Sequence, residues 1–193
     1  MKAAFRAAPA LGATGYELTG GVLRSDAGWS LPLAEVEAVT FVTFTAARLR
    51  QMRLDLFHGG RRRSVGLALA QGTDPAHSED YRQFLTFAAA TLTALEDARP
   101  GLPVQLGEVG RARLVMFALG LVAALGGVGL FVLALASGVS GARLAKGGGA
   151  MAALAMLGLI IAWGAHPWRK LPQIASRELS ARFRRWLADL DRG

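Results

Sequence analysis

Residues 114–142 form an unbroken run of 29 residues without an ionisable side chain, and this run limits the possible folds more than any other feature. An α-helix rises about 1.5 Å per residue, so roughly 20 residues cross a hydrocarbon core about 30 Å thick. A second uncharged run covers residues 147–166. We therefore predict a transmembrane hairpin within segment 111–168, with spans at 114–136 and 147–166.

The second run is shorter in apolar length than the first. Its apolar core, residues 150–165, has 16 residues and reaches spanning length by including the glycines at 147–149. A re-entrant or interfacial segment is the alternative for this run. Small residues that permit close backbone approach recur at four-residue spacing and favour packing of the two helices. These pairs are Gly120/Ala124, Ala123/Gly127 and Gly158/Ala162.

Basic residues flank the predicted hairpin unequally. Nine lie on the side of the two termini, and two, Arg143 and Lys146, lie between the spans. Lys and Arg are retained in cytoplasmic segments, so both termini are expected in the cytoplasm. Segment 1–17 has no apolar stretch of the length that a cleaved signal peptide needs, which agrees with this orientation.

Composition divides the chain of 193 residues into two parts. Residues 1–113 carry 13 basic and 11 acidic residues, whereas residues 114–193 carry nine and three. The net charge of +8 therefore arises mainly beside the apolar runs, and no basic stripe with interleaved aromatic residues predicts nucleic-acid binding. The chain contains no cysteine, which excludes disulfides, thiolate metal ligands and cysteine nucleophiles.

Residues 16–70 show the period of two that is typical of strands. Met52, Leu54 and Leu56 fall on one face, and Arg53 and Asp55 fall on the other, polar face. Gly59-Gly60 predicts a two-residue hairpin turn. We expect an antiparallel meander with strands at 16–24, 29–33, 36–45, 50–58 and 62–70.

A helical period follows the strands. Asp74-Pro75 predicts the start of the helix, with an N-cap carboxylate and a proline in the first turn. One apolar stripe contains Tyr81, Phe84, Leu85, Ala88, Leu92 and Leu95. Arg99-Pro100-Gly101 ends the helix, and residues 102–106 form an extended link into the membrane. We predict an α+β domain over residues 1–110, in which this helix covers an antiparallel sheet.

The order of these elements resembles the pleckstrin-homology-like (PH-like) domains of small bacterial membrane proteins. The matching outline covers about residues 14–110: a strand ending at 29–32, then LAEVEAV, RLRQMRLDLFHGGRRRSVGLA, the helix DYRQFLTFAAATLTAL and LPVQLG. That fold has seven strands before its helix, where this pattern supplies about five, and segment 2–10 is a candidate for another. The resemblance implies a binding or scaffolding module and transfers no functional residue.

The most concentrated charge in this domain is Arg61-Arg62-Arg63, directly after the predicted turn. In a membrane-tethered domain these side chains are candidates for contact with anionic lipid headgroups. A solvated hairpin tip is the other interpretation. The remaining candidate headgroup contacts are Arg169, Lys170, Arg184 and Arg185.

No pattern predicts catalysis, a cofactor or a metal site. His58, His77 and His166 are isolated from one another and from carboxylate clusters, whereas a metal requires convergent ligands. Acidic residues at 74, 79 and 80 gather where a helix N-terminus favours negative charge. The chain has neither a G-x-S-x-G elbow nor a phosphate-binding glycine loop.

Segment 169–193 predicts a basic amphipathic C-terminal helix, in which Leu179, Phe183 and Trp186 share a face. This helix either lies at the membrane interface or docks on the N-terminal domain. We expect a non-catalytic, membrane-anchored binding module at a bacterial inner membrane, with the bilayer, anionic headgroups or a membrane protein as partner. The alternative is an accessory subunit of a larger membrane complex or transporter, docked through the Gly/Ala-rich helix faces.

Overall fold

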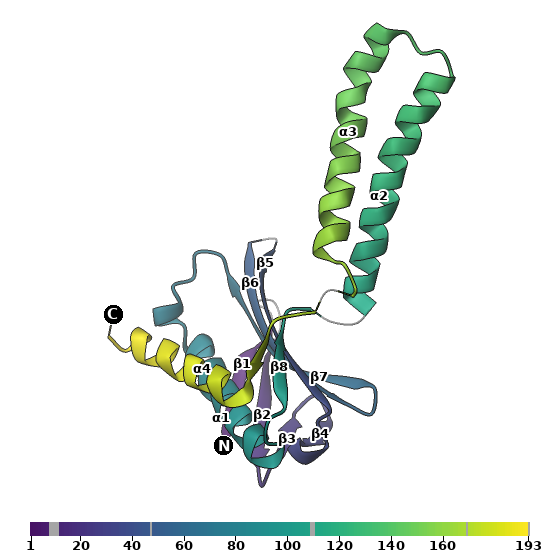
Figure 1. Cartoon of the computed structure of the whole chain (residues 1–193). Helices are drawn as coiled ribbons and strands as arrows, with labels where there is room; N and C mark the ends of the chain where they lie inside the picture. Colours follow the sequence, from purple (N-terminus) through teal and green to yellow (C-terminus); the bar gives the residue numbers. More distant parts are fainter. Residues whose placement is uncertain (8–11, 47, 109–110, 169, 193) are drawn as a thin grey trace. The chain divides into compact units, whose positions relative to one another are not determined.

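The computed structural model describes residues 1–7, 12–46, 48–108, 111–168 and 170–192. They form two compact units. The first, here called the sheet unit, contains Met1–Gly107 together with Leu171–Gly193, and the second, the hairpin unit, contains Glu108–Lys170. The protein is α+β, and its described residues form two sheets and four α-helices (Figure 1).

The first sheet has four antiparallel strands in the order β1-β2-β3-β4. Gly20 and Gly21 connect β2 to β3 with φ angles of 57° and 73°, a conformation that favours glycine. The prediction of one strand over residues 16–24 is therefore wrong, because the glycine pair reverses the chain. The strands are β1 (Lys2–Arg6), β2 (Ala13–Thr19), β3 (Val22–Ser25) and β4 (Trp29–Pro32).

The second sheet has the order β7-β6-β5-β8-β9. Its pairs are antiparallel except β5 with β8, which is parallel. The predicted turn at Gly59-Gly60 is confirmed between β6 and β7, with φ angles of 54° and 69°. Over the described residues, seven strands precede the first α-helix. The strands of this sheet are β5 (Ala38–Ala46), β6 (Leu49–His58), β7 (Arg61–Ala70), β8 (Pro103–Leu106) and β9 (Gln173–Ala175).

Helix α1 (Glu79–Ala98) begins later than the sequence predicts. Asp74 caps only the short 3-10 helix η2 (Pro75–His77), because its carboxylate accepts from the Ala76 amide at 2.9 Å. The N-cap of α1 is Ser78, whose hydroxyl oxygen accepts from the Tyr81 amide at 3.3 Å. The predicted assignment of Asp74 as the cap of the long helix is therefore wrong.

The apolar stripe predicted on α1 is confirmed, since every member is at most 5% exposed. The stripe packs on a core that both sheets share. The Phe5 ring lies 5.0 Å from the Tyr16 ring and 5.6 Å from the Phe84 ring, measured between centroids. An aromatic cluster thus joins β1, β2 and α1.

The predicted link over residues 102–106 is a sheet strand, β8, and the hairpin unit is inserted between β8 and β9. The Leu106 amide donates to the Pro172 carbonyl oxygen at 2.8 Å. The two chain connections to the hairpin unit are therefore hydrogen-bonded to each other where they leave and re-enter the sheet unit.

Helix α4 (Ser176–Leu190) belongs to the sheet unit and packs on α1 (Figure 1). Its Leu179 and Phe183 are 1% and 0% exposed, and the Phe183 ring lies 5.1 Å from the Phe41 ring. The Ser180 hydroxyl donates to the Ala89 carbonyl oxygen of α1 at 2.9 Å. Of the two alternatives left open for segment 169–193, the structure therefore shows docking: the apolar face of α4 is buried in the domain core.

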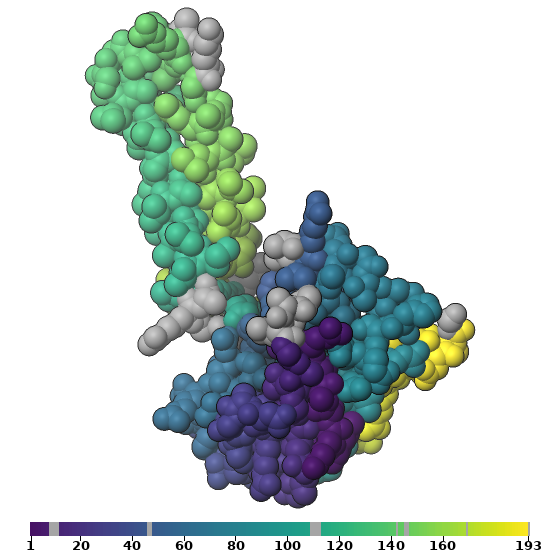
Figure 2. All heavy atoms as spheres, turned by 180° about the vertical axis from the view of Figure 1, so that it is seen from behind, coloured from purple at the N-terminus to yellow at the C-terminus, as the bar shows by residue number. Residues whose placement is uncertain are grey.

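The hairpin unit contains α2 (Arg111–Ala136) and α3 (Gly141–Gly164), which lie side by side in both views (Figures 1 and 2). A β-carbon added at Gly127 would lie 2.7 Å from the Ala155 amide nitrogen and from the Met151 carbonyl oxygen. Gly120 and Gly158 approach the facing helix equally closely. The predicted packing through small residues is therefore confirmed, with backbones in direct contact.

Two segments of these helices are long and apolar enough to cross a membrane, as the sequence predicts. They are Arg113–Ala136, with 24 residues, and Gly147–Gly164, with 18. At about 1.5 Å per residue they are about 36 Å and 27 Å long. Large apolar side chains point outward from both helices, and Val122 and Ile160 are 69% and 68% exposed.

Replacing Gly127 with leucine is expected to destabilise the hairpin unit by about 1–3 kcal/mol, because the new side chain overlaps the α3 backbone. The matched control is Gly126→Leu, since an added β-carbon there meets no heavy atom within 4 Å. Circular dichroism, recorded while each full-length variant unfolds in mixed micelles, measures the difference in stability between the two variants. Equal stability of the two variants would contradict this packing.

Replacing Phe183 with alanine is expected to cost about 3–5 kcal/mol of stability, the usual range for removing a buried phenylalanine ring. Arg185→Ala, an exposed position on the same helix, serves as the control. Thermal unfolding of the detergent-solubilised full chain gives the comparison. An unchanged melting temperature for the Phe183 variant would show that α4 does not hold the core.

Candidate functional site

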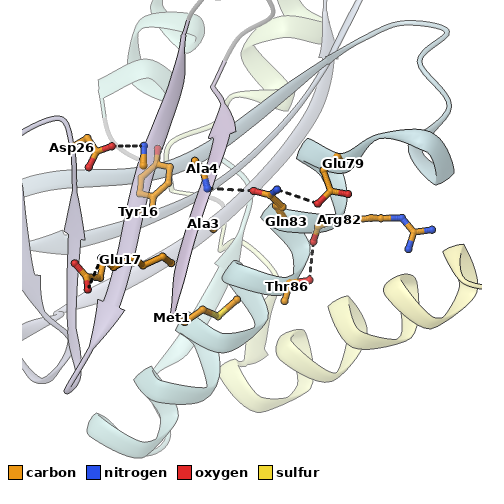
Figure 3. Close-up of a pocket in the computed structure, with 12 residues that line it drawn as sticks. Met1, Ala3, Ala4, Tyr16, Glu17, Asp26, Glu79, Arg82, Gln83 and Thr86 are labelled. Atoms are coloured by element: carbon orange, nitrogen blue, oxygen red, sulfur yellow. Dashed lines mark hydrogen bonds and ion pairs between the residues drawn. The ribbon is translucent and has the colours of Figure 1, made fainter.

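A groove of about 690 Å³ lies between the edge strand β1 and helix α1 (Figure 3). Its floor has short side chains, because Ala4 of β1 pairs with Gly15 of β2. Glu79, Gln83 and Thr86 of α1 line its other side. The groove is thus a hollow between the first sheet and the helix that covers its edge.

The backbone edge of β1 is partly closed by α1. The Ala4 amide donates to Gln83 Oε1 at 3.3 Å, and Gln83 Nε2 donates to Glu79 Oε1 at 3.0 Å (Figure 3). Unpaired edge strands invite pairing with another chain, and a covering helix prevents this. At Ala4, a glutamine side chain occupies the place that an added strand would take.

The groove carries charges of both signs, most of them paired. Lys2 lies 3.7 Å from Glu17, and the Asp26 carboxylate accepts from the Gly15 amide at 3.0 Å. Arg82 extends away from the groove toward α4 (Figure 3), where it pairs with Asp191. Burial raises the pKa of the Tyr16 phenol, and a hydrogen bond to the Gly66 backbone opposes that rise. These contacts link the first sheet to α1 and α4, and the groove has no excess of charge of one sign.

A second, more basic pocket of about 290 Å³ lies between β4 and the β6–β7 turn. Arg61 and Arg63 line it together with Ser30 and His58. The Arg63 guanidinium lies 5.8 Å from the centroid of the Trp29 ring, a cation–π distance. We call the hollow lined by these four residues the β4–β7 pocket.

The acids near this pocket already have partners. His58 Nδ1 lies 3.0 Å from the Glu35 carbonyl oxygen, and His58 Nε2 lies 3.3 Å from the Glu35 carboxylate. The Glu37 carboxylate accepts from the Gly59 amide at 3.0 Å. Within the described part of the chain, Arg61 and Arg63 have no ion pair, so two guanidinium groups face the hollow. Such an arrangement can bind an anion.

The arginine triplet is therefore divided by the alternation of β7. Arg62 points to the opposite face of the strand from Arg61 and Arg63. Its Nη1 lies 4.0 Å from Asp55 Oδ2. Of the three arginines in this triplet, the structure brings two, Arg61 and Arg63, together in one pocket.

The sequence predicts that Asp55 and Arg53 share the strand face opposite Leu54, and the structure shows that Asp55 is buried there. It is 1% exposed, and Arg53 Nε lies 2.9 Å from both of its carboxylate oxygens. The Ser64 hydroxyl donates to Asp55 Oδ1 at 2.5 Å. The predicted face is correct, and a buried carboxylate is permitted there because Arg53 of the same strand and Ser64 of β7 donate to it.

The other candidate basic residues do not join the β4–β7 pocket. Arg184 lines a separate pocket between α1 and α4, where it donates to Thr93 Oγ1 at 2.9 Å. Arg185 is exposed on α4, and Lys170 is exposed at the end of the hairpin unit. Arg169 lies outside the described residues.

The remaining polar candidates have structural partners. The Ala76 amide, and then His77, lower the pKa of Asp74. His77 Nδ1 lies 2.7 Å from Asp74 Oδ2. Among the described residues, no three metal-ligating side chains lie together. His58 was not predicted to lie beside Arg61, and the sequence carries no local signal that brings Trp29 and Ser30 to the same place.

Comparison with known proteins adds no relative: no family model, no curated protein and no solved structure matches the chain.

Proposed function

We propose that the chain is a non-catalytic binding module anchored by the hairpin unit in a bacterial inner membrane. The observation that carries this proposal is the outward exposure of large apolar side chains along both helices, such as Val122, Leu133 and Ile160. Transferring a side chain of this size from water into an apolar medium is worth about 1.5–3 kcal/mol. These side chains are therefore more stable in contact with lipid acyl chains than in water.

The ends of the hairpin unit support an orientation with both termini in the cytoplasm. Trp163 and Trp168 are 78% and 76% exposed, and indole rings favour the membrane interface. Arg113 Nη2 donates to the His166 carbonyl oxygen at 2.5 Å, so a basic side chain lies at the same end. The excess of basic residues on this side argues for the cytoplasm.

The sheet unit supports a PH-like binding domain as the finer assignment of the fold. Seven described strands in two sheets, followed by α1, have the element order of such domains. The β4–β7 pocket suits a phosphate-bearing anion such as a lipid headgroup, because Arg61 and Arg63 face it from one strand. We therefore assign anionic headgroup binding to this pocket.

Membrane anchoring predicts that the full chain stays in the membrane fraction after an alkaline carbonate wash. Because the chain has no cysteine, single cysteines report sidedness directly. An impermeant maleimide is expected to label Val139→Cys, between the spans, in spheroplasts and to label Ala34→Cys only after lysis.

Release of the protein into the carbonate supernatant as a monomer would overturn the anchoring. Labelling of both cysteines in intact spheroplasts, or of Ala34→Cys alone, would overturn the orientation.

Anion binding predicts that phosphate raises the melting temperature of the detergent-solubilised full chain relative to chloride at equal ionic strength. The double variant Arg61→Ala/Arg63→Ala is expected to lose this rise, since a charge-assisted hydrogen bond contributes about 1.5–3 kcal/mol. Arg24→Ala, an exposed arginine of β3, is expected to keep it. An equal phosphate effect in all three proteins would contradict the assignment.

A further inference from the structure

The pocket between α1 and α4 is a polar hollow within the sheet unit, at the contact of the two helices (Figure 1). Its volume of about 460 Å³ lies in the range of about 300–1,000 Å³ that is typical of small-molecule sites. Its lining residues occupy one face of each helix, at spacings of three and four. The polar ones are Thr93, Glu96 and Asp97 of α1 and Arg177, Ser180 and Arg184 of α4. We call this pocket the α1–α4 hollow.

The two walls of the hollow carry opposite charges. Both acids, Glu96 and Asp97, come from α1, and both arginines, Arg177 and Arg184, come from α4. In the described part of the chain, none of these four side chains forms an ion pair. The lining therefore has a net charge near zero, although its acidic and basic groups do not neutralise each other directly.

Hydrogen bonds between the helices fix the spacing of these walls. The hydroxyls of Thr93 and Ser180 lie 3.0 Å apart, and each donates to the Ala89 carbonyl oxygen at 2.9 Å. Arg184 Nη2 donates to Thr93 Oγ1 at 2.9 Å. The guanidinium of Arg184 is thus oriented by an uncharged partner at the acidic wall and keeps further N–H groups for another acceptor.

The charges of the hollow do not stabilise the helices that carry them. Glu96 and Asp97 lie in the last turn of α1, which has no basic residue, and Arg177 lies in the first turn of α4. A helix is stabilised by the reverse arrangement, with acids at its N-terminus and bases at its C-terminus. Helix stability therefore does not explain these residues, whereas a binding role does.

Glu96 has a hydrogen-bond acceptor that the protein leaves unused. Its Oε1 accepts from the Gly101 amide at 3.2 Å, which holds the side chain beside the end of α1. Its Oε2 is buried and has no hydrogen-bond partner among the described residues. A buried carboxylate oxygen without a donor is unfavourable. An ammonium group in the hollow can supply that donor once the carboxylate turns slightly.

We propose that the α1–α4 hollow binds a small zwitterion that carries a primary ammonium group and an oxyanion. The ammonium group donates to the carboxylates of Glu96 and Asp97, and the guanidinium groups of Arg177 and Arg184 donate to the oxyanion. A ligand with both charges pairs with both walls, whereas a simple cation or anion leaves one wall unpaired. Free α-amino acids and the ethanolamine phosphate headgroup of lipids share this chemistry.

Isothermal titration calorimetry of the full chain in a nonionic detergent tests the site with two zwitterions. L-alanine represents the free amino acids, and glycerophosphoethanolamine represents the lipid headgroup. Ethylammonium and acetate, which each carry one of the two charges, are the reference ligands at equal ionic strength. We expect one of the zwitterions to bind at least tenfold more tightly than either reference ligand, and the tighter zwitterion identifies the source. Equal or absent binding of all four ligands overturns the proposal.

Removing one charge from either wall is expected to weaken binding of that zwitterion at least tenfold. The variants are Asp97→Asn and Arg177→Gln, both at exposed positions. The matched controls, Glu178→Gln and Arg182→Gln, alter an ion pair on α4 that does not line the hollow and are expected to keep the parental affinity. Circular dichroism verifies that each variant is folded. Parental affinity in both hollow variants overturns the assignment.

The double variant Arg61→Ala/Arg63→Ala separates this site from the β4–β7 pocket. We expect it to bind the zwitterion as the parent does, because neither arginine lines the α1–α4 hollow. Loss of zwitterion binding in this variant overturns the location proposed here. Retention of the phosphate effect on its melting temperature overturns only the anion binding proposed for the β4–β7 pocket.

Discussion

The pairing of β8 with β9 is the constraint on which the sheet unit depends. Strand β8 pairs with β5 on one side and β9 on the other, and Val104 and Ile174, one from each of the paired strands, are buried in the core. Strand β9 leads directly into α4, whose Phe183 is fully buried. Because β9 and α4 follow the hairpin in sequence, the core is completed only by residues on both sides of it. The hairpin unit is therefore an insertion within the domain in sequence, and the hydrogen bond from the Leu106 amide to the Pro172 carbonyl oxygen joins the two chain segments that flank it.

Sequence periodicity predicted the long elements and failed on most of the short ones. The stripe on α1 and the turn at Gly59-Gly60 were predictable, since each repeats over enough residues or uses a turn-specific pair. Strands β3, β8 and β9 have four, four and three residues, too few for a period of two to be distinctive, whereas β4 (Trp29–Pro32) falls within the predicted strand 29–33. The docking of α4 was left open because a basic amphipathic face suits a membrane surface and a domain core equally well. The two possibilities are distinguished only by the contact of α4 with α1 in the folded domain.

The candidate site was less predictable than the fold because it depends on contacts between distant strands. Three consecutive arginines read as one cluster in sequence, yet a strand sends alternate side chains to opposite faces. Arg63 therefore meets Trp29, 34 positions earlier, while Arg62 approaches Asp55. Asp55 shows the same limit, since its burial requires Arg53 and Ser64 as donors. Spacing predicts which side chains share a face, and tertiary pairing determines which of them are exposed.

The small-residue pattern of the hairpin bears on whether a partner helix is needed. Gly120, Gly127 and Gly158 are used within the hairpin, where any β-carbon would meet the backbone of the facing helix. The spacing that suggested a docking face is thus explained by the contact of α2 with α3. A partner helix would have to meet the outer surface, where Gly126 and Gly129 have no neighbour within 4 Å and the side chains around them are large. The small residues of α2 and α3 pack against each other, and the large apolar side chains point outward. This is the distribution expected for a helix pair surrounded by lipid chains.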